Sequence, residues 1–363
     1  MRVFVINPGS TSTRLALYED DRAVLTSELH HPKGEIARFT HIADQFAYRL
    51  AAMDGVLGQW NLDPASLHGV AGRGGLLRPM EGGVYEVSAE MLDELKSAPH
   101  GEHACNLGAP LARELADRAG VGAYIVDPVV TDELDDVARI TGLPGIRRRS
   151  LFHALSQRGV ARTAAARRGV DYAQADFIVC HMGGGISIGA HRRGRVVEVV
   201  NALDGEGPFS PERTGGLPLV PVLDLIEGGE RTPGEMKRMV QREGGLFAHL
   251  GTNDLREVLG RMARGDEAAA RLFHALAYGV ARHIGSLAPV LADGEGRVAV
   301  AAVVLTGGLA RSNLFVNEIR RMVGYLGPVE VVVGDEEMAA LARGVTRALR
   351  GEEPVKHYAP ARR

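Results

Sequence analysis

Residues 176–201 read DFIVCHMGGGISIGAHRRGRVVEVVN, and this stretch decides the fold. The apolar run that starts at Phe177 predicts a short buried strand, and Met182 precedes three glycines with too little side chain to pack. Alternation from Ile186 predicts a second strand, and residues 195–200 a third. The glycine turn of this hairpin exposes backbone N–H groups that can bind a phosphate, although such a turn can also be only a tight reversal of the chain.

The strand-turn pattern occurs twice more in the chain. Near the start, the apolar strand 3–6 leads into the small polar turn NPGSTST (residues 7–13) and a returning strand at 14–18. Further on, the apolar strand 301–305 runs into Thr-Gly-Gly at 306–308. Three such turns, far apart in sequence, predict two related halves facing one cleft and favour phosphate binding.

Composition restricts the class of protein. The chain has 363 residues, enough for about two domains, and its 45% apolar and 24% charged residues are typical of a soluble globular protein. The formal charge of −3 gives no reason to expect nucleic acid or an anionic membrane as partner. Without a long apolar run, a signal-peptide pattern or more than two cysteines, we expect a cytoplasmic protein that neither spans a membrane nor depends on disulfides.

Two polar residues follow predicted strands directly. Arg73 lies between glycines after the run 69–71, where its guanidinium can bind a carboxylate or phosphate, or can simply face solvent. Asp127 follows the strand 123–126. A carboxylate at the carboxyl end of a strand in an α/β sheet faces the ligand crevice, but a turn or helix-capping aspartate fits the pattern equally well.

Two further candidates lie in and after a predicted helix. Ser150 is expected to cap a helix over 151–168, which puts His153 in its first turn as a neutral donor toward an anion or as a structural histidine. The rigid, glycine-rich loop 201–216 has the composition of a functional loop, and Arg213 is its only base.

Strands alternate with helices along the chain, so the fold class is α/β. Amphipathic or capped segments predict the helices at 40–57, 89–96, 106–119, 266–291, 312–322 and 336–349. No G-x-x-x-x-G-K-[ST] motif and no strand-anchored G-x-G-x-x-G motif is present, which excludes P-loop and Rossmann nucleotide binding.

Five motifs in order then resemble one family: NPGSTST (7–13), AGRGG (71–75), VDPVV (126–130), HMGGG (181–185) and LTGG (305–308). The chain resembles the butyrate kinases and branched-chain fatty-acid kinases of the acetate kinase family over nearly its whole length. The resemblance implies two actin-like (ribonuclease H-like) domains of common plan with an interdomain nucleotide cleft. It further implies a homodimer or higher homo-oligomer.

The resemblance also implies domain limits. The N-terminal domain, on the acyl-substrate side, would span residues 1–126, and the C-terminal helix 338–363 would return to it. The C-terminal nucleotide-binding domain would span 127–337.

On the acyl side, the matching positions imply roles residue by residue. Arg73 is similar to the arginine that holds the acyl carboxylate, and His103 matches a substrate-side histidine loosely, because the sequence around it is one residue shorter. Asp127 resembles the catalytic aspartate that organises magnesium and water. Asn7, with Glu336 or Glu337, matches the residues on the metal side.

On the phosphate side, His153 resembles the histidine that steadies the transferring phosphoryl group, and Arg213 the second catalytic arginine. The remaining matches to ATP- and phosphate-binding positions are Ser10, Ser12, Arg14, His181, Gly183, Gly184, Gly185, Asp254, Arg256, Gly307 and Gly308. Arg14 stands where acetate kinases usually have lysine, and three glycines replace a Gly-Asn-Gly loop.

The implied reaction is reversible, direct in-line transfer from ATP, with Mg²⁺, to a short-chain fatty acid such as butyrate or isobutyrate, giving ADP and an acyl phosphate. A carboxylate with a pKa near ~4–5 is already ionised at neutral pH, so it needs no general base. Two alternatives stay open: an acetate or propionate kinase, and a non-catalytic ATP-binding protein on the same fold.

Overall fold

The computed structural model describes residues 1–334 and 336–358, except for the side chain of Glu336. The chain forms two compact units, each with its own sheet. The first unit comprises Met1–Asp132, Ala154–Gly159 and the described part of Asp335–Arg363, and the second comprises Glu133–His153 and Val160–Gly334. The assignment of the acyl substrate to one domain and the nucleotide to the other stays a prediction, as does a cleft between them.

The first unit is built on a seven-stranded sheet in the order β12-β5-β6-β4-β1-β2-β3. Its strands are β1 (Arg2–Pro8), β2 (Ser12–Glu19), β3 (Arg22–His30), β4 (Gly69–Gly72), β5 (Val84–Glu86), β6 (Gly122–Val126) and β12 (Val355–Lys356). The first three form an antiparallel meander, and β4 and β6 continue the sheet in parallel with β1.

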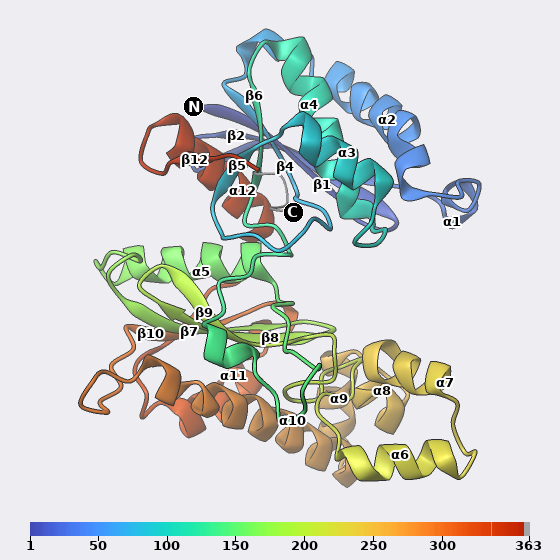
Figure 1. Cartoon of the computed structure of the whole chain (residues 1–363), viewed down its shortest axis with the longest axis vertical. Coiled ribbons are helices and arrows are strands. Elements are labelled where there is room, and N and C mark those ends of the chain that lie inside the picture. Colours follow the sequence, from blue (N-terminus) through green and yellow to red (C-terminus); the bar gives the residue numbers. More distant parts are fainter. Residues whose placement is uncertain (335, 359–363) are drawn as a thin grey trace. The chain divides into compact units, whose positions relative to one another are not determined.

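Helices cover both faces of this sheet because its central strand is apolar on both sides. Phe4 and Ile6 of β1 pack in the core formed with α2 (Phe46–Gln59), α3 (Ala89–Ser97) and α4 (Gly108–Ala119). Val3 and Val5 point the other way and pack against α12 (Glu336–Leu349). In the first unit, α2, α3 and α4 lie on one side of the sheet and α12 lies on the other (Figure 1). A short helix, α1 (Lys33–Ile36), follows β3.

The second unit is built on a five-stranded sheet in the order β11-β10-β7-β8-β9. Its strands are β7 (Asp176–Met182), β8 (Ile186–Arg192), β9 (Arg195–Val200), β10 (Ala302–Thr306) and β11 (Val329–Val331). Its helices are α5 (Ala154–Arg167, from Val160 onward), α6 (Leu219–Glu227), α7 (Pro233–Arg238), α8 (Gly245–Leu250), α9 (Leu255–Ala263), α10 (Glu267–Ser286) and α11 (Asn313–Val323).

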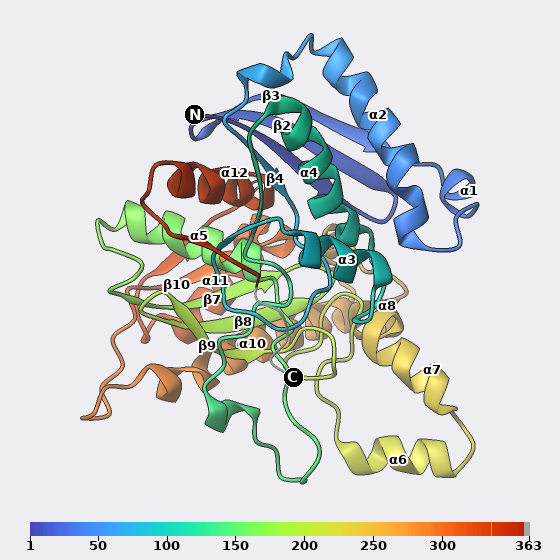
Figure 2. The ribbon, with the colours of Figure 1, turned by 45° about the horizontal axis from the view of Figure 1, so that its top comes forward.

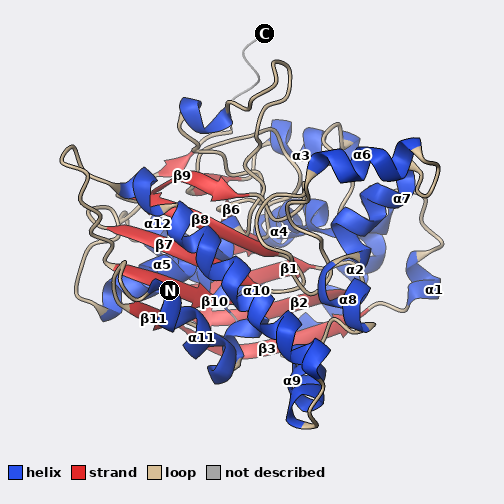
Figure 3. Cartoon of the chain, turned by 90° about the horizontal axis from the view of Figure 1, so that it is seen from below, coloured by secondary structure: helices blue, strands red, loops and turns tan. Residues whose placement is uncertain are grey.

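The two faces of the second sheet are covered by different helices. Residues such as Ile178 and Cys180 pack with the apolar faces of α10 and α11, and α10 runs across the strands of the sheet (Figure 3). Phe177 and Val179 point to the opposite face and pack against the second half of α5. This helix is labelled beside β7 and β10 in Figure 2.

Both units share one strand plan. In each, three sequential strands form an antiparallel meander, and two later strands add in parallel beside the first, giving the orders β3-β2-β1-β4-β6 and β9-β8-β7-β10-β11. A register irregularity interrupts the second hairpin in both, at Leu17/Tyr18 and at Ala190/His191. The turn NPGSTST and the turn Gly183–Gly185 therefore occupy equivalent places. The predicted α/β fold of two actin-like domains is confirmed.

Some predicted elements differ from the structure. Helix α5 begins at Ala154 with His153 as its N-cap, so the expectation that Ser150 caps the helix was wrong. The predicted helix over 266–291 ends at Ser286 because Pro289 has no N–H to continue it, and a separate 3₁₀ turn follows. Near the C-terminus, Val355–Lys356 pairs with β5, and residues 359–363 lie outside the described part.

Candidate active site

A carboxylate and two arginines meet at the end of the central strands of the first unit. Nη1 of Arg73 donates to Oε2 of Glu337 at 2.7 Å and to Oδ1 of Asn7 at 3.2 Å. Nη2 of Arg14, which pairs with Asn7 across β1 and β2, donates to the same Glu337 oxygen at 3.3 Å. Nδ2 of Asn7 also donates to it, at 3.2 Å. Four predicted residues from three separate segments thus form one polar network, while the side chain of Glu336 lies outside the described atoms.

The local sequence explains how Arg73 reaches this network. Gly72 ends β4 and Gly108 opens α4, and the backbone of the two segments lies so close that a Cβ on Gly72 would overlap the carbonyl of Gly108. A Cβ on Gly108 would in turn overlap the carbonyl of Arg73. The glycines on both sides let the strand end pass directly against the start of α4, which leaves the arginine side chain to turn toward Asn7.

Asp127 is held in place just after β6. It is 3% exposed and adopts a positive φ of 40°, which is uncommon for a residue other than glycine. The N–H of Gly83 donates to its Oδ1 at 2.8 Å, and Nε of Arg158 lies 2.7 Å from the same oxygen. A buried ion pair and a strained backbone therefore fix the carboxylate, an arrangement often found at functional sites.

His103 lies in the first unit and caps a 3₁₀ turn. The N–H of Cys105 donates to its Nδ1 at 3.2 Å. Burial lowers the pKa of His103, and the positive charges of Arg73 and Arg49 lower it further. The imidazole is therefore neutral near pH 7, as a donor or acceptor close to the arginine network.

The glycine turn of the second unit packs against residues 210–213. The hydroxyl of Ser210 donates to the carbonyl of Gly184, as does the N–H of Glu212 at 3.3 Å. A Cβ on Gly185 would overlap Nη1 of Arg213. None of Gly183, Gly184 and Gly185 has a positive φ, so close approach of the arginine, not backbone strain, is what requires glycine at 185.

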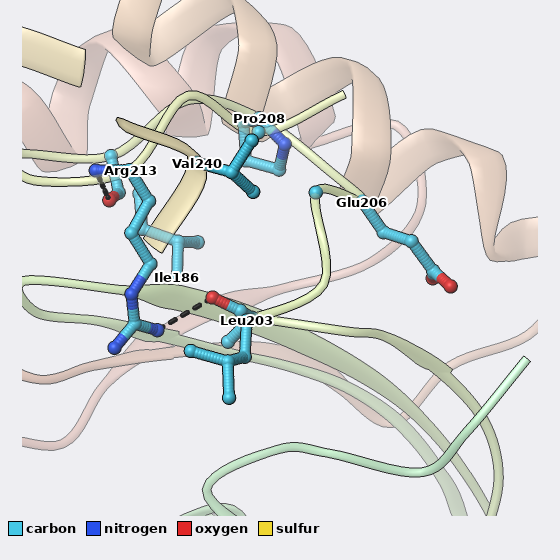
Figure 4. Close-up of a pocket in the computed structure, with 10 residues that line it drawn as sticks. Ile186, Leu203, Glu206, Pro208, Arg213 and Val240 are labelled. Carbon is cyan, nitrogen blue, oxygen red and sulfur yellow. Dashed lines mark hydrogen bonds between the residues drawn. The ribbon is translucent and has the colours of Figure 1, made fainter. Parts of the chain in front are cut away.

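Arg213 is held by backbone carbonyls. Its Nη1 donates to the carbonyl of Ala202 at 2.6 Å, and its Nε donates to that of Gln241 at 3.2 Å. Figure 4 shows its side chain beside Leu203 and Ile186, at the edge of a water-sized pocket of about 10 Å³. Burial lowers the pKa of Arg213, although a guanidinium stays charged at any physiological pH.

His153 and His181 stack on each other in the second unit. Their ring centroids are 3.9 Å apart and their planes differ by 11°. Nδ1 of His153 lies 2.7 Å from the hydroxyl of Ser187, to which the N–H of His153 also donates at 3.3 Å. Ser187 pairs with His181 across β7 and β8. The serine therefore fixes the orientation of the His153 ring.

The other predicted residues of the second unit lie at the start of α9 and at the turn after β10. Asp254 caps α9 and forms an ion pair with Arg256 at 2.7 Å, on side chains that are 39% and 90% exposed. Gly307 has a φ of 89°, and a Cβ there would overlap the backbone of Met182. Glycine is therefore required at 307 for the turn after β10 to pass the turn after β7, whereas Gly308 has open space around it.

Three residues with clear roles were not predicted from the sequence: Arg158, Ser187 and Arg49. Each acts through a partner distant in sequence, and no local motif marks any of them. Arg158 is the partner of Asp127, Ser187 that of His153, and Arg49 contacts the turn after β1.

Among the described residues, no group of three or more His, Cys, Asp or Glu side chains could hold a metal ion. Within the same residues, no helix combines the length and the apolar character that crossing a bilayer requires.

Solved structures that resemble this fold include an acetate kinase and a propionate kinase. The acetate kinase of Porphyromonas gingivalis covers 95% of this chain and 99% of its own, with a TM-score of 0.75 at 19% identity. A propionate kinase from Francisella tularensis covers 95% and 98%, with a TM-score of 0.72 at 17% identity. These likenesses establish the fold, an actin-like pair of ribonuclease H-like domains.

Sequence similarity then identifies the family. Residues 140–347 match the model of the acetokinase family. A protein named "probable butyrate kinase" from Maridesulfovibrio salexigens is 49% identical over 358 residues, 98% of each chain. Another of that name from Oleidesulfovibrio alaskensis is 52% identical over 364 residues, again 98% of each. The chain belongs to the acetokinase family.

Proposed function

We propose that this protein is a short-chain fatty-acid kinase of the butyrate kinase type, which transfers the terminal phosphoryl group of ATP to a carboxylate. The products are ADP and an acyl phosphate, and the reaction is reversible. The main support is the network in which the Arg73 guanidinium already binds a carboxylate, that of Glu337, beside Asn7. The two relatives named as probable butyrate kinases, similar over nearly the whole chain, add to it.

The chemistry needs positioning and charge neutralisation more than proton transfer. A fatty-acid carboxylate is ionised at neutral pH and attacks phosphorus directly. Its approach to an anionic phosphate is opposed by charge repulsion, which fixed guanidinium groups offset. Arg73 in the first unit would hold the acid, and Arg213 in the second would neutralise the developing charge. His153, oriented by Ser187, would donate a hydrogen bond to the transferring phosphoryl group.

Asn7 and Glu337 are the residues that would hold a magnesium ion. An amide and a carboxylate oxygen suit Mg²⁺, which binds few protein oxygens and keeps several waters. When bound, magnesium neutralises charge on the phosphates. Asp127, fixed by Arg158 and Gly83, would orient water or polar groups near that site. We include in the proposal a cytoplasmic homodimer or larger homo-oligomer, as the family resemblance implies.

Acid-dependent turnover tests the proposal against a non-catalytic ATP-binding protein. Purified protein is mixed with ATP, Mg²⁺ and butyrate, and ADP release is followed with a coupled enzyme assay. The proposal requires ADP release that saturates with butyrate and stops without it. ATP binding with no acid-dependent turnover would favour the non-catalytic alternative.

A further inference from the structure

The turn after β1 carries two predicted phosphate-binding hydroxyls, on Ser10 and Ser12. Ser10 and Thr11, two neighbouring residues of this turn, are exposed. Within the described part of the chain, the N–H groups of Ser10 and Thr11 donate to no protein acceptor. The turn thus presents the two backbone donors of Ser10 and Thr11 on an exposed segment, next to the half-buried Ser12.

Behind this turn lies Arg49, an arginine of α2 whose side chain is completely buried. Its Nη1 donates to the carbonyls of Gly9 at 3.0 Å and Ser12 at 3.1 Å. Its Nη2 donates to the carbonyl of Ser10 at 3.3 Å. A single guanidinium therefore holds three carbonyls of one short turn.

The remaining donors of Arg49 are bound by neutral side chains. Nη1 also donates to the hydroxyl of Thr13 at 2.9 Å, and Nε and Nη2 donate to Oε1 of Gln45 at 3.0 and 2.9 Å. His31, which lies 2.8 Å from that hydroxyl, has its pKa lowered to about 4 by burial and by the nearby Arg49 charge, so it is neutral too. Among the described residues, no carboxylate forms an ion pair with Arg49.

Burying a charge without a counter-charge lowers the free energy of unfolding, so a functional role for Arg49 would account for its presence. In a trans peptide unit, the carbonyl of one residue and the N–H of the next point in opposite directions. Because Arg49 holds the carbonyls of Gly9 and Ser10, the N–H groups of Ser10 and Thr11 must point away from it, toward the exposed side of the turn. The same guanidinium adds a positive charge directly behind those donors.

We propose that Arg49 is a positioning residue for phosphate: it turns the N–H groups of Ser10 and Thr11 outward and supplies the charge that attracts the phosphate oxygens of the nucleotide. The proposal rests on the function above, in that ATP is the phosphate donor. It goes further by giving a role to a residue that touches no substrate and lies in none of the five motifs quoted above.

The test uses three variants of the full-length protein. Arg49→Gln removes the charge and part of the fork, and Arg49→Lys keeps the charge but lacks the planar fork whose two terminal nitrogens bind the carbonyls. Met53→Ala is the matched control: Met53 is also completely buried, on the same helix one turn further on, and belongs to the apolar core of the first unit. Thermal unfolding of each variant separates loss of stability from loss of phosphate binding.

We expect Arg49→Gln to raise the KM and Kd for ATP about tenfold or more, because a charge and two aligned donors are lost together. The KM for the fatty acid should change less than about twofold, because the proposed role concerns the phosphate and not the acid. A general loss of stability would instead affect the KM for both substrates. Arg49→Lys should fall between wild type and Arg49→Gln. Met53→Ala should lower the melting temperature and leave the KM for ATP unchanged.

Three results would overturn the proposal. One is an unchanged ATP Kd in folded Arg49→Gln, and another is an equal rise of the KM for ATP and for the acid. The third is a rise of the KM for ATP in Met53→Ala as large as in the Arg49 variants. If Arg49→Gln does not fold, the comparison of Arg49→Lys with Met53→Ala decides. Calorimetry measures ATP binding whether or not the protein phosphorylates an acid. The proposal for Arg49 can therefore fail independently of the proposed kinase activity.

Discussion

The guanidinium of Arg73 binds the carboxylate of Glu337, with Nη1 and Oε2 2.7 Å apart. Asn7 and Arg14 donate to the same oxygen, so Glu337 is the centre of the network. A substrate carboxylate that binds to Arg73 must therefore share or replace this interaction. Arg73 is only 29% exposed, so the ion pair is stronger than one on an open surface.

Replacing Arg73 with alanine should selectively weaken binding of the acid. Charge-assisted hydrogen bonds to a carboxylate contribute about 1.5–3 kcal/mol each, so the KM for butyrate should rise on the order of 100-fold. The KM for ATP should change far less. Steady-state kinetics with each substrate varied separately measure both constants. Arg118→Ala, which removes exposed ion pairs on α4, is the control and should behave as wild type; a wild-type KM for butyrate in Arg73→Ala would refute the role.

Asp127→Asn should affect both the reaction and the fold. The substitution removes the negative charge that Asp127 places beside Arg158, which is 6% exposed. Breaking a buried ion pair in this way costs about 3–5 kcal/mol, so chemical denaturation should show a clearly lower free energy of unfolding. We expect kcat to drop on the order of 10²–10³-fold while ATP binding persists. A variant with near-normal kcat would rule out a catalytic role for Asp127.

Gly185→Ala should displace Arg213 without abolishing the fold. The new methyl group would overlap Nη1 of Arg213, the far end of a flexible side chain, so the arginine must move. The proposed charge neutralisation then fails, and kcat should fall about tenfold or more. Gly234→Ala on α7, where a Cβ meets nothing within 4 Å, is the control and should be neutral or slightly stabilising. Equal kinetics in the two variants would contradict the role of Arg213.

Below about pH 6.5, the free energy of unfolding should decrease as the pH falls, because of His31. Its pKa is lowered from 6.5 to about 4 in the folded state by burial and by the charges of Arg49 and His30. The unfolded chain therefore binds a proton between these values while the folded chain does not, and the free energy of unfolding decreases as the pH falls through this window. The decrease should be about 2–3 kcal/mol. Urea unfolding at pH 7 and pH 4.5 measures it, and His31→Gln should show a smaller difference than wild type.

The sequence predicted those parts of the fold that depend on local pattern. Apolar runs and alternation around turns predicted the strands at 3–6, at 14–18 and within 177–200, and amphipathic or capped segments predicted helices such as 89–96. Two very short strands escaped prediction: β5 and β12 have three and two residues, and they depend on pairing with neighbours, β5 with β6 and β12 with β5. The start of α5 was wrong because Ser187, a residue distant in sequence, holds the backbone of His153 outside the helix.

The candidate site likewise contains residues that the sequence predicted and residues that it did not. Residues on glycine turns and strand ends, such as Asn7 and Arg73, were predicted because a motif surrounds them. Arg49 and Arg158 sit in helices of ordinary composition, and their importance comes from burial and from partners 31 to 40 residues away. Only the tertiary structure brings those partners together, so a single sequence carries no signal for them.

The central claim, that a short fatty acid accepts the phosphoryl group, is tested most directly by trapping the acyl phosphate with hydroxylamine. The protein is incubated with ATP, Mg²⁺ and, in turn, acetate, propionate, butyrate, isobutyrate and isovalerate, and the hydroxamate formed gives kcat/KM for each acid. The account predicts hydroxamate with several acids and a maximum of kcat/KM at four or five carbons. A maximum at acetate or propionate would contradict the butyrate-type assignment, and no hydroxamate with any acid would contradict carboxylate phosphorylation itself.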